Sequence, residues 1–226
     1  MNASVHYVDE GSGKTLVLLH GNGESSDYLK EQIDAFKKRF RIIAPDTRGH
    51  GLSPRGNTPF TLDQFVADLE ELLDGLGIRK VHILGFSDGA NIAMLFAMKQ
   101  PERIRSLVLA GGNIFPEGLE DSVRAQDAID LAEAVQQGDT SREEMLRLMT
   151  DEPQIKPVDL GCICAPALVM AGTQDMVKEE HTRLIAASIP NAQLRFIEGN
   201  HFAIYENPKA FNRIVESFYA QIEQQV

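Results

Sequence analysis

The sequence predicts an α/β fold: a doubly wound, mostly parallel β-sheet with helices on both faces. Short apolar runs alternate with segments of helical periodicity along most of the chain. Several of these runs, such as Leu16–Leu19 and Leu107–Leu109, are apolar at every position. Strands of that kind are typical of sheets covered by helices on both faces. The length of 226 residues also suits one large α/β domain.

The predicted strands are short aliphatic runs bounded by turn residues. A Gly-rich turn at Asp9–Lys14 separates the first two and indicates a hairpin connection. In chain order we expect strands at Val5–Val8, Thr15–His20, Arg41–Asp46, Val81–Gly85, Ser106–Gly111, Ala167–Gly172 and Gln193–Ile197.

The segments between these strands carry apolar residues at helical spacing. The clearest helix begins behind a Thr61-x-x-Gln64 capping box and keeps an apolar face from Phe65 to Leu76. Further helices are expected at Ser26–Phe40, Asp88–Lys99, Lys178–Ser188 and Pro208–Gln221.

Residues 113–161 interrupt the alternation. Their pattern indicates no strand. It predicts helices at Leu119–Gln137 and Ser141–Met149, and the second begins behind a Ser141-x-x-Glu144 capping box. An all-helical insertion after a strand is expected to form a small lid over the carboxyl edge of the sheet. We therefore predict a single domain over residues 1–226 that carries a helical lid at about 113–161.

Composition narrows the range of partners and compartments. The formal net charge of -11 argues against binding to nucleic acid or to an anionic membrane, since both usually require a basic face. The longest apolar run, Ile92–Met98, is far shorter than the roughly 18 residues of a spanning helix. Met1–Ser4 show no secretory signal, so we expect a cytoplasmic protein. Cys162 and Cys164 are expected to be free thiols, buried as small hydrophobic residues.

The segment Gly85-Phe86-Ser87-Asp88-Gly89 lies between a predicted strand and a predicted helix. In that context, Gly-x-Ser-x-Gly forms a sharp turn that exposes the serine hydroxyl, because the glycines let neighbouring backbone pass close by. The amide of Asp88 at the helix N-terminus would then be free to bind a developing oxyanion. Ser87 is therefore the predicted nucleophile.

A serine nucleophile needs a base, usually a histidine oriented by a carboxylate. His201 follows the last predicted strand, and Asp175 follows the strand before it. Both therefore fall at the carboxyl ends of strands, where open α/β sheets bind ligands. The other five histidines (His6, His20, His50, His82 and His181) are interpreted as structural or solvated, and Asp46 is a weaker rival for the acid.

The order Ser87, Asp175, His201 resembles that of the α/β-hydrolase-fold serine hydrolases, and the resemblance extends over nearly the whole chain. Leu18-Leu19-His20-Gly21-Asn22-Gly23 resembles the family's first oxyanion segment. The resemblance implies that Asn22 supplies the second oxyanion amide and that Gly21 contacts substrate. The loop Pro45–Ser53 resembles a structural loop of the family, and Ser87-Asp88-Gly89 is similar to the valacyclovir-hydrolase-like branch.

The resemblance implies hydrolysis of a small-molecule ester by acyl transfer to Ser87, without metal or cofactor. Thioesterase, lactonase, C–C bond hydrolase and perhydrolase reactions use the same triad and remain alternatives, as does a non-catalytic binding or signalling module of this fold. The Asp88 carboxylate would oppose a nearby oxyanion unless a positive group offsets it. Substrates with an α-ammonium group are therefore expected to be preferred. The sequence carries no signal for an oligomeric state.

Overall fold

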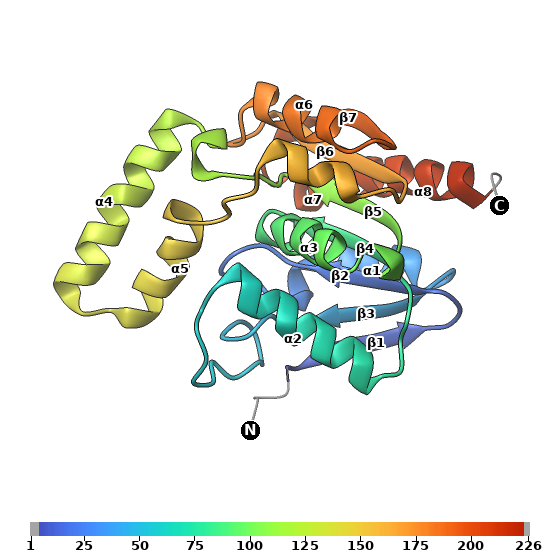
Figure 1. Cartoon of the computed structure of the whole chain (residues 1–226), viewed down its shortest axis with the longest axis horizontal. Helices are drawn as coiled ribbons and strands as arrows, with labels where there is room; N and C mark the ends of the chain where they lie inside the picture. The colour runs from blue at the N-terminus through green and yellow to red at the C-terminus, as the bar shows by residue number, and fades with distance from the viewer. Residues whose placement is uncertain (1–4, 224–226) are drawn as a thin grey trace.

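The computed structural model describes residues 5–223, so the prediction made for Met1–Ser4 concerns residues outside this range. Seven strands form one sheet in the order β1-β3-β2-β4-β5-β6-β7 (Figure 1). Only β1 runs antiparallel to its neighbour, β3, and the other neighbouring strands pair in parallel. The predicted mostly parallel sheet is confirmed. The strands are β1 (Tyr7–Gly11), β2 (Thr15–Leu19), β3 (Arg41–Pro45), β4 (Val81–Phe86), β5 (Ile104–Ala110), β6 (Ala167–Gln174) and β7 (Ala192–Asn200).

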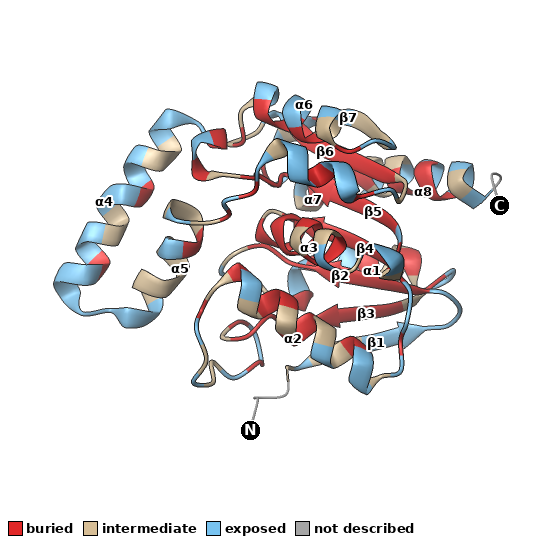
Figure 2. Ribbon diagram, viewed as in Figure 1, coloured by how far each residue is buried: buried red, intermediate tan, exposed pale blue. Residues whose placement is uncertain are grey.

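Helices cover both faces of this sheet, and the core lies in two layers between them and the strands. Val17 and Leu19 of β2 pack into one layer, whereas Leu16 and Leu18 pack into the other. This alternation explains why β2 is apolar at every position, and the central strands are buried throughout (Figure 2). One face carries α2 (Leu62–Gly75), α3 (Asp88–Lys99) and α6 (Glu179–Ser188), and the other carries α1 (Lys30–Phe36) and α8 (Pro208–Glu223).

Between β5 and β6 the chain forms α4 (Asp121–Gln137) and α5 (Thr140–Thr150), which we call the helical hairpin. Gly138 ends α4 in the left-handed conformation and allows the chain to reverse within a few residues. The helical hairpin projects from the side of the molecule where the parallel strands end, and most of its surface is exposed (Figures 1 and 2). No strand occurs within described residues 111–166.

Several local expectations were wrong. The helix predicted at Ser26–Phe40 begins as a 3-10 helix, and its α-helical part covers only Lys30–Phe36. The α5 helix is capped by Asp139, which accepts a hydrogen bond from Arg142 N–H, and not by Ser141. By contrast, the Thr61 cap of α2 is confirmed, since its side chain accepts from Gln64 N–H. The short helix α7 (Ala203–Glu206) was not predicted.

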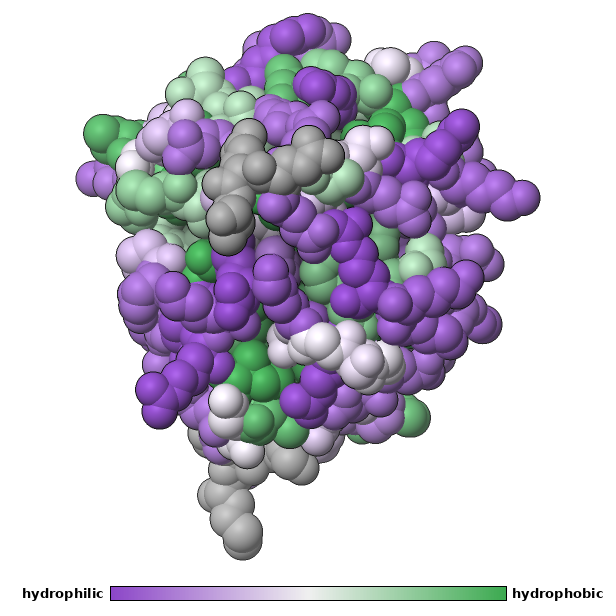
Figure 3. Space-filling model, turned by 90° about the vertical axis from the view of Figure 1, so that its right-hand side faces the viewer, coloured by the Kyte–Doolittle hydropathy of each residue, from purple (hydrophilic) through white to green (hydrophobic). Residues whose placement is uncertain are grey.

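Both cysteines are free thiols, as expected, but they are exposed rather than buried. They lie at the end of a 3-10 helix and in the loop before β6, outside the packed layers. Within residues 5–223 no helix is both long enough and apolar enough to cross a membrane. The face turned away from the helical hairpin is mostly hydrophilic (Figure 3).

Candidate active site

Ser87 occupies the turn between β4 and α3, with φ 53° and ψ -121°. It is the only residue other than glycine with a positive φ among residues 5–223. Such a conformation costs of order 1–3 kcal/mol and persists only where the surroundings impose it. Here Ser87 N–H donates to Ala110 O of the neighbouring strand at 2.8 Å, which helps to hold the turn.

The glycines two residues on either side of Ser87 are required by close backbone approaches. A Cβ built on Gly85 would lie 2.2 Å from the Gly89 carbonyl oxygen, and one on Gly89 would lie 2.3 Å from the Leu19 carbonyl oxygen. Neither distance is compatible with a side chain. The spacing that singled out Ser87 in the sequence thus has a direct steric reason in the structure.

His201 connects Ser87 to Asp175. Its Nε2 lies 3.1 Å from Ser87 Oγ, and its Nδ1 lies 2.6 Å from Asp175 Oδ1. The three residues directly follow β4, β6 and β7, so the carboxyl ends of three parallel strands bring them together. Because an ionised carboxylate only accepts hydrogen bonds, this arrangement places the imidazole proton on Nδ1 and leaves Nε2 to accept the serine proton.

The environment of Asp175 keeps its carboxyl group ionised. Burial by itself would raise the pKa of Asp175, but the hydrogen bond and charge of His201 and hydrogen bonds from Gly172 N–H and Val177 N–H outweigh it and lower the pKa. These two amides donate to different carboxylate oxygens, at 3.0 and 3.1 Å, and fix the plane of the group. Asp175 is therefore held as an oriented negative charge behind His201.

Two backbone N–H groups near Ser87 have no acceptor among the described residues. Asp88 N–H lies in the first turn of α3, where helix geometry supplies no acceptor. Asn22 N–H lies in the turn after β2, and Gly21 in the same turn is in close contact with Ser87: a Cβ built on Gly21 would lie 3.2 Å from Ser87 Cβ. Both N–H groups therefore belong to segments next to Ser87, and neither is used by the fold within residues 5–223.

The sequence over residues 14–147, more than half of the chain, matches the family model described as the alpha/beta hydrolase fold. The chain belongs to the α/β-hydrolase fold family. A hydrolase from Pseudomonas aeruginosa PA01 has a similar structure, with a TM-score of 0.83 and 28% identity over 96% of this chain and 94% of that one.

Other relatives in the α/β-hydrolase family differ in the chemistry that their names give. Serine hydrolase BPHL of Mus musculus is 28% identical over 95% of this chain and 82% of that protein. Haloalkane dehalogenase 2 of Mycobacterium bovis is 35% identical over 50% of this chain and 40% of that protein.

The Asp88 side chain is buried in this α/β hydrolase, with only 8% of its surface exposed. Asn91 Nδ2 donates to its Oδ1 at 3.2 Å, whereas its buried Oδ2 has no hydrogen-bond partner among the described residues. Burial raises the pKa of Asp88 to about 7, and the negative charges of Glu152 and Glu24 add to the shift, against Asn91 and His201. A favourable helix terminus alone does not explain a buried carboxylate with a free oxygen.

Asp46, the rival for the catalytic acid, and His20, another candidate histidine, bind parts of the fold other than Ser87. Asp46 accepts hydrogen bonds from Ser26 N–H, Leu52 N–H and the His6 ring. His20 Nε2 accepts from Thr47 N–H, and its Nδ1 lies 2.7 Å from Gly21 O, so this histidine supports the turn that contains Asn22. Because burial lowers the pKa of His20 to about 4, the ring is neutral at pH 7.

Sequence reasoning missed three residues beside the predicted triad. Gly111 leaves room for the imidazole, because a Cβ built there would lie 2.8 Å from His201 Cε1. Glu24 and Tyr205 are hydrogen bonded to each other close to Ser87, although 181 positions separate them in the chain. The only sequence signal for Glu24 was a carboxylate directly after the His20–Gly23 segment.

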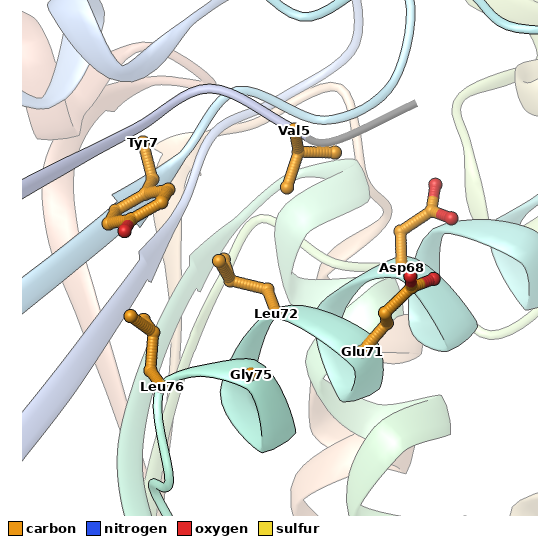
Figure 4. A pocket seen from close by; sticks show the side chains of 7 residues that line it. All are labelled: Val5, Tyr7, Asp68, Glu71, Leu72, Gly75 and Leu76. Atoms are coloured by element: carbon orange, nitrogen blue, oxygen red, sulfur yellow. The ribbon is translucent and has the colours of Figure 1, made fainter. Parts of the chain in front are cut away.

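A cavity of about 330 Å³ lies elsewhere, between the start of the chain and α2 (Figure 4). Its lining includes none of the residues predicted for the site. Asp68, at one end of it, is already paired with Arg48. Within residues 5–223 no group of three or more His, Cys, Asp or Glu side chains is arranged to hold a metal ion.

Proposed function

We propose that this α/β hydrolase is a serine hydrolase that cleaves small carboxylic esters through an acyl-enzyme. The observation that carries the proposal is the hydrogen-bond chain from Asp175 through His201 to Ser87. The name of the relative BPHL, a serine hydrolase, supports the same chemistry.

In the first step, Ser87 Oγ attacks the ester carbonyl carbon while His201 Nε2 takes its proton. Asp175 stabilises the resulting imidazolium, and the N–H groups of Asn22 and Asp88 bind the oxyanion. The carbon–oxygen bond to the leaving group then breaks, and His201 returns the proton to the departing alkoxide. Water deprotonated by His201 hydrolyses the acyl-enzyme, releases the acid and restores Ser87.

We further propose that the helical hairpin acts as a lid over the substrate, within a single domain that spans the chain. Asn22 Nδ2 donates to the carbonyl of Met145 on α5 at 2.8 Å, which supports the placement of α5 beside the oxyanion turn. Arg55 pairs with Glu144 on the same helix and supports the same arrangement. Gly21, which contacts Ser87 and directly precedes Asn22, is the residue of this turn that we expect to contact substrate.

The Asp88 carboxylate supports a preference for α-amino acyl esters, as expected for the valacyclovir-hydrolase-like branch. Its buried Oδ2 has no hydrogen-bond partner within residues 5–223, and the ammonium group of a substrate would supply one. Glu24 and Glu152 add negative charge close enough to affect its pKa. Loss of such a charge-assisted contact costs about 1.5–3 kcal/mol, or about tenfold to over a hundredfold in selectivity.

The test combines covalent labelling with a substrate panel. A fluorophosphonate is expected to label the wild type and not Ser87→Ala. Matched pairs of esters with and without an α-amino group, together with a thioester, a lactone and a carbon–carbon substrate, then give kcat/KM for each bond type. Full turnover by Ser87→Ala contradicts the serine mechanism. Equal kcat/KM for an amino ester and its deaminated analogue contradicts the role given to Asp88.

A further inference from the structure

Glu24 links the turn after β2 to the helix that follows His201. Its Oε2 accepts hydrogen bonds from Gly21 N–H at 2.9 Å and from the Tyr205 hydroxyl at 2.5 Å. Glu24 N–H in turn donates to Gly21 O at 3.3 Å, so backbone and side chain both close this turn. Tyr205 belongs to α7, which begins two residues after His201.

These contacts lie against the predicted nucleophile and base. A Cβ built on Gly21 would lie 3.0 Å from Glu24 Oε2 and 3.2 Å from Ser87 Cβ, so both side chains border the same small space. The Tyr205 ring packs edge-on against Phe86, with 5.0 Å between centroids, and Phe86 packs against the His201 ring at 4.9 Å.

The turn held in this way carries the Asn22 N–H. A carboxylate oxygen that accepts two hydrogen bonds at once fixes the relative position of the two donors. The two donors to Glu24 are Gly21, which directly precedes Asn22, and Tyr205, which belongs to the helix after His201. The turn with Asn22 follows β2, and the segment with His201 follows β7. Because β2 and β7 are not neighbours in the sheet, strand pairing alone does not fix the distance between these two segments.

We infer that Glu24 is a positioning residue: through Tyr205 it sets the distance between the Asn22 oxyanion amide and the His201–Ser87 pair. The inference rests on the serine hydrolase function proposed above. Glu24 acts through the backbone that it holds, and its contribution depends on acceptor geometry. Its negative charge is not required. Gln at position 24 retains a carbonyl oxygen that can accept from Gly21 and Tyr205, whereas Ala retains none.

The experiment compares Glu24→Ala, Glu24→Gln and Tyr205→Phe in the full chain, with kcat and KM for one neutral ester and the rate of fluorophosphonate labelling. Active-site titration with the same label corrects for inactive molecules. We expect Glu24→Ala to lower kcat and the labelling rate by about tenfold to a hundredfold with KM little changed, since small misplacements of reacting groups cost that much. Glu24→Gln should stay within about threefold of the wild type, and Tyr205→Phe should fall between the two.

Two matched controls separate this role from general destabilisation. Glu31→Ala removes an exposed carboxylate from α1, and Tyr28→Phe removes a hydroxyl from a ring that packs 5.8 Å from Tyr205. Both should retain wild-type kcat. Thermal unfolding of every variant identifies those that fail to fold. If Glu24→Ala does not fold, Tyr205→Phe decides the question, because it removes one of the two donors to Glu24 and a kcat equal to that of the wild type would overturn the inference.

Each other outcome overturns the inference. Unchanged kcat in Glu24→Ala rules out positioning, and a change in KM alone would make Glu24 a substrate-binding residue. Equal losses in Glu24→Gln and Glu24→Ala would show that charge matters and acceptor geometry does not. A wild type that neither labels nor hydrolyses esters overturns the proposed function as well, and the wild-type arm alone reveals this.

Discussion

Ser87 has a strained backbone conformation, and hydrogen bonds fix both its backbone N–H and its hydroxyl. Its positive φ is imposed by β4, by the bond to Ala110 and by glycines that have no room for a side chain. The hydroxyl, the imidazole and the carboxylate are therefore held in place before any substrate arrives. Such preorganisation is what acyl transfer requires, because only a few degrees of freedom then remain to be fixed in the transition state.

The first prediction concerns Ser87 and His201 as one unit. Ser87→Ala and His201→Ala should each lower ester turnover by several orders of magnitude, because each removes the same proton-coupled attack. The double variant should lose little more than either single one, since residues that act together are strongly non-additive. Additive losses in steady-state kcat/KM would show that the two residues act separately.

The second prediction follows from the raised pKa of Asp88. Its carboxyl group is mostly protonated below its pKa of about 7 and negative above it. The preference of kcat/KM for an α-amino ester over its deaminated analogue should therefore rise between about pH 5.5 and 7.5. Above about pH 8 it should fall again as the substrate ammonium group loses its proton.

Asp88→Asn supplies the control for this pH dependence. Its preference should be small and flat below pH 8, while its rate with the deaminated ester stays near that of the wild type. Because the ratio compares two substrates at each pH, titration of the shared catalytic groups cancels. A wild-type ratio that does not change across this range would rule out Asp88 as the ammonium partner.

At the scale of single residues, sequence reasoning could find what is encoded locally. Ser87 has its glycines within two positions, and Asp175 and His201 directly follow apolar strands, so the strand ends indicated that they converge. Glu24 and Tyr205 could not be found in this way. Their pairing depends on how the turn after β2 meets a short helix that the sequence did not predict, 181 positions away.

The helical hairpin lies outside the two layers of helices that cover the sheet (Figure 1). Its links to the turns after β2 and β3 include the Asn22 bond to Met145 and the Arg55 pair with Glu144. Glu152, just past α5, also accepts from Leu62 N–H at the start of α2. Apart from its own helix–helix contacts, the helical hairpin is held by these polar contacts, by Leu148 of α5, which packs into one core layer, and by Asp121 of α4, which pairs with Lys178.

The third prediction concerns removal of this element. With residues 121–150 replaced by a short Gly/Ser linker, the ratio of kcat/KM for short against long acyl esters should change by about tenfold or more, because wall contacts with individual methylenes are lost. Fluorophosphonate labelling should slow no more than in Asn22→Ala, which breaks the link to Met145 and keeps the backbone N–H. An unchanged chain-length ratio would show that the helical hairpin does not contact the acyl group.

The start of α5 shows how two capping signals in the sequence can compete for one helix N-terminus. Asp139 and Ser141 both lie near the start of α5, and each could cap it. Asp139 prevails because Gly138 ends α4 in the left-handed conformation, so the new helix must begin directly after the reversal. The sequence predicted two helices and a turn correctly. The choice of cap depended on the geometry of that turn.

Across the whole molecule, one buried ion pair connects the loop after β3 to α2. Arg48 is 1% exposed and donates from Nε to Asp68 Oδ2 at 2.7 Å and from Nη2 to the other oxygen. Removal of one partner leaves a buried charge without compensation, which typically costs about 3–5 kcal/mol. This pair lies outside the proposed site, so its loss should affect folding and not chemistry.

The fourth prediction tests that separation. Asp68→Ala should lower the free energy of unfolding in urea by about 3–5 kcal/mol, with kcat per titrated active site unchanged. The control is Asp9→Ala, which breaks a half-exposed pair with Arg41 and should cost about 0.2–1 kcal/mol. Equal costs for the two variants would show that the buried pair contributes no more than the exposed one.

The attachment of the helical hairpin at one point of the sheet, between β5 and β6, also bears on how such chains diversify. A recombination event that exchanges residues 113–161 leaves the strand order and the three strand ends after β4, β6 and β7 intact. Under the roles proposed above, such an exchange keeps the triad and changes the segment expected to contact the substrate. The incoming segment would have to replace the contacts that residues 113–161 make with the rest of the chain, among them the acceptor that Met145 offers Asn22 and the ion pair of Glu144 with Arg55.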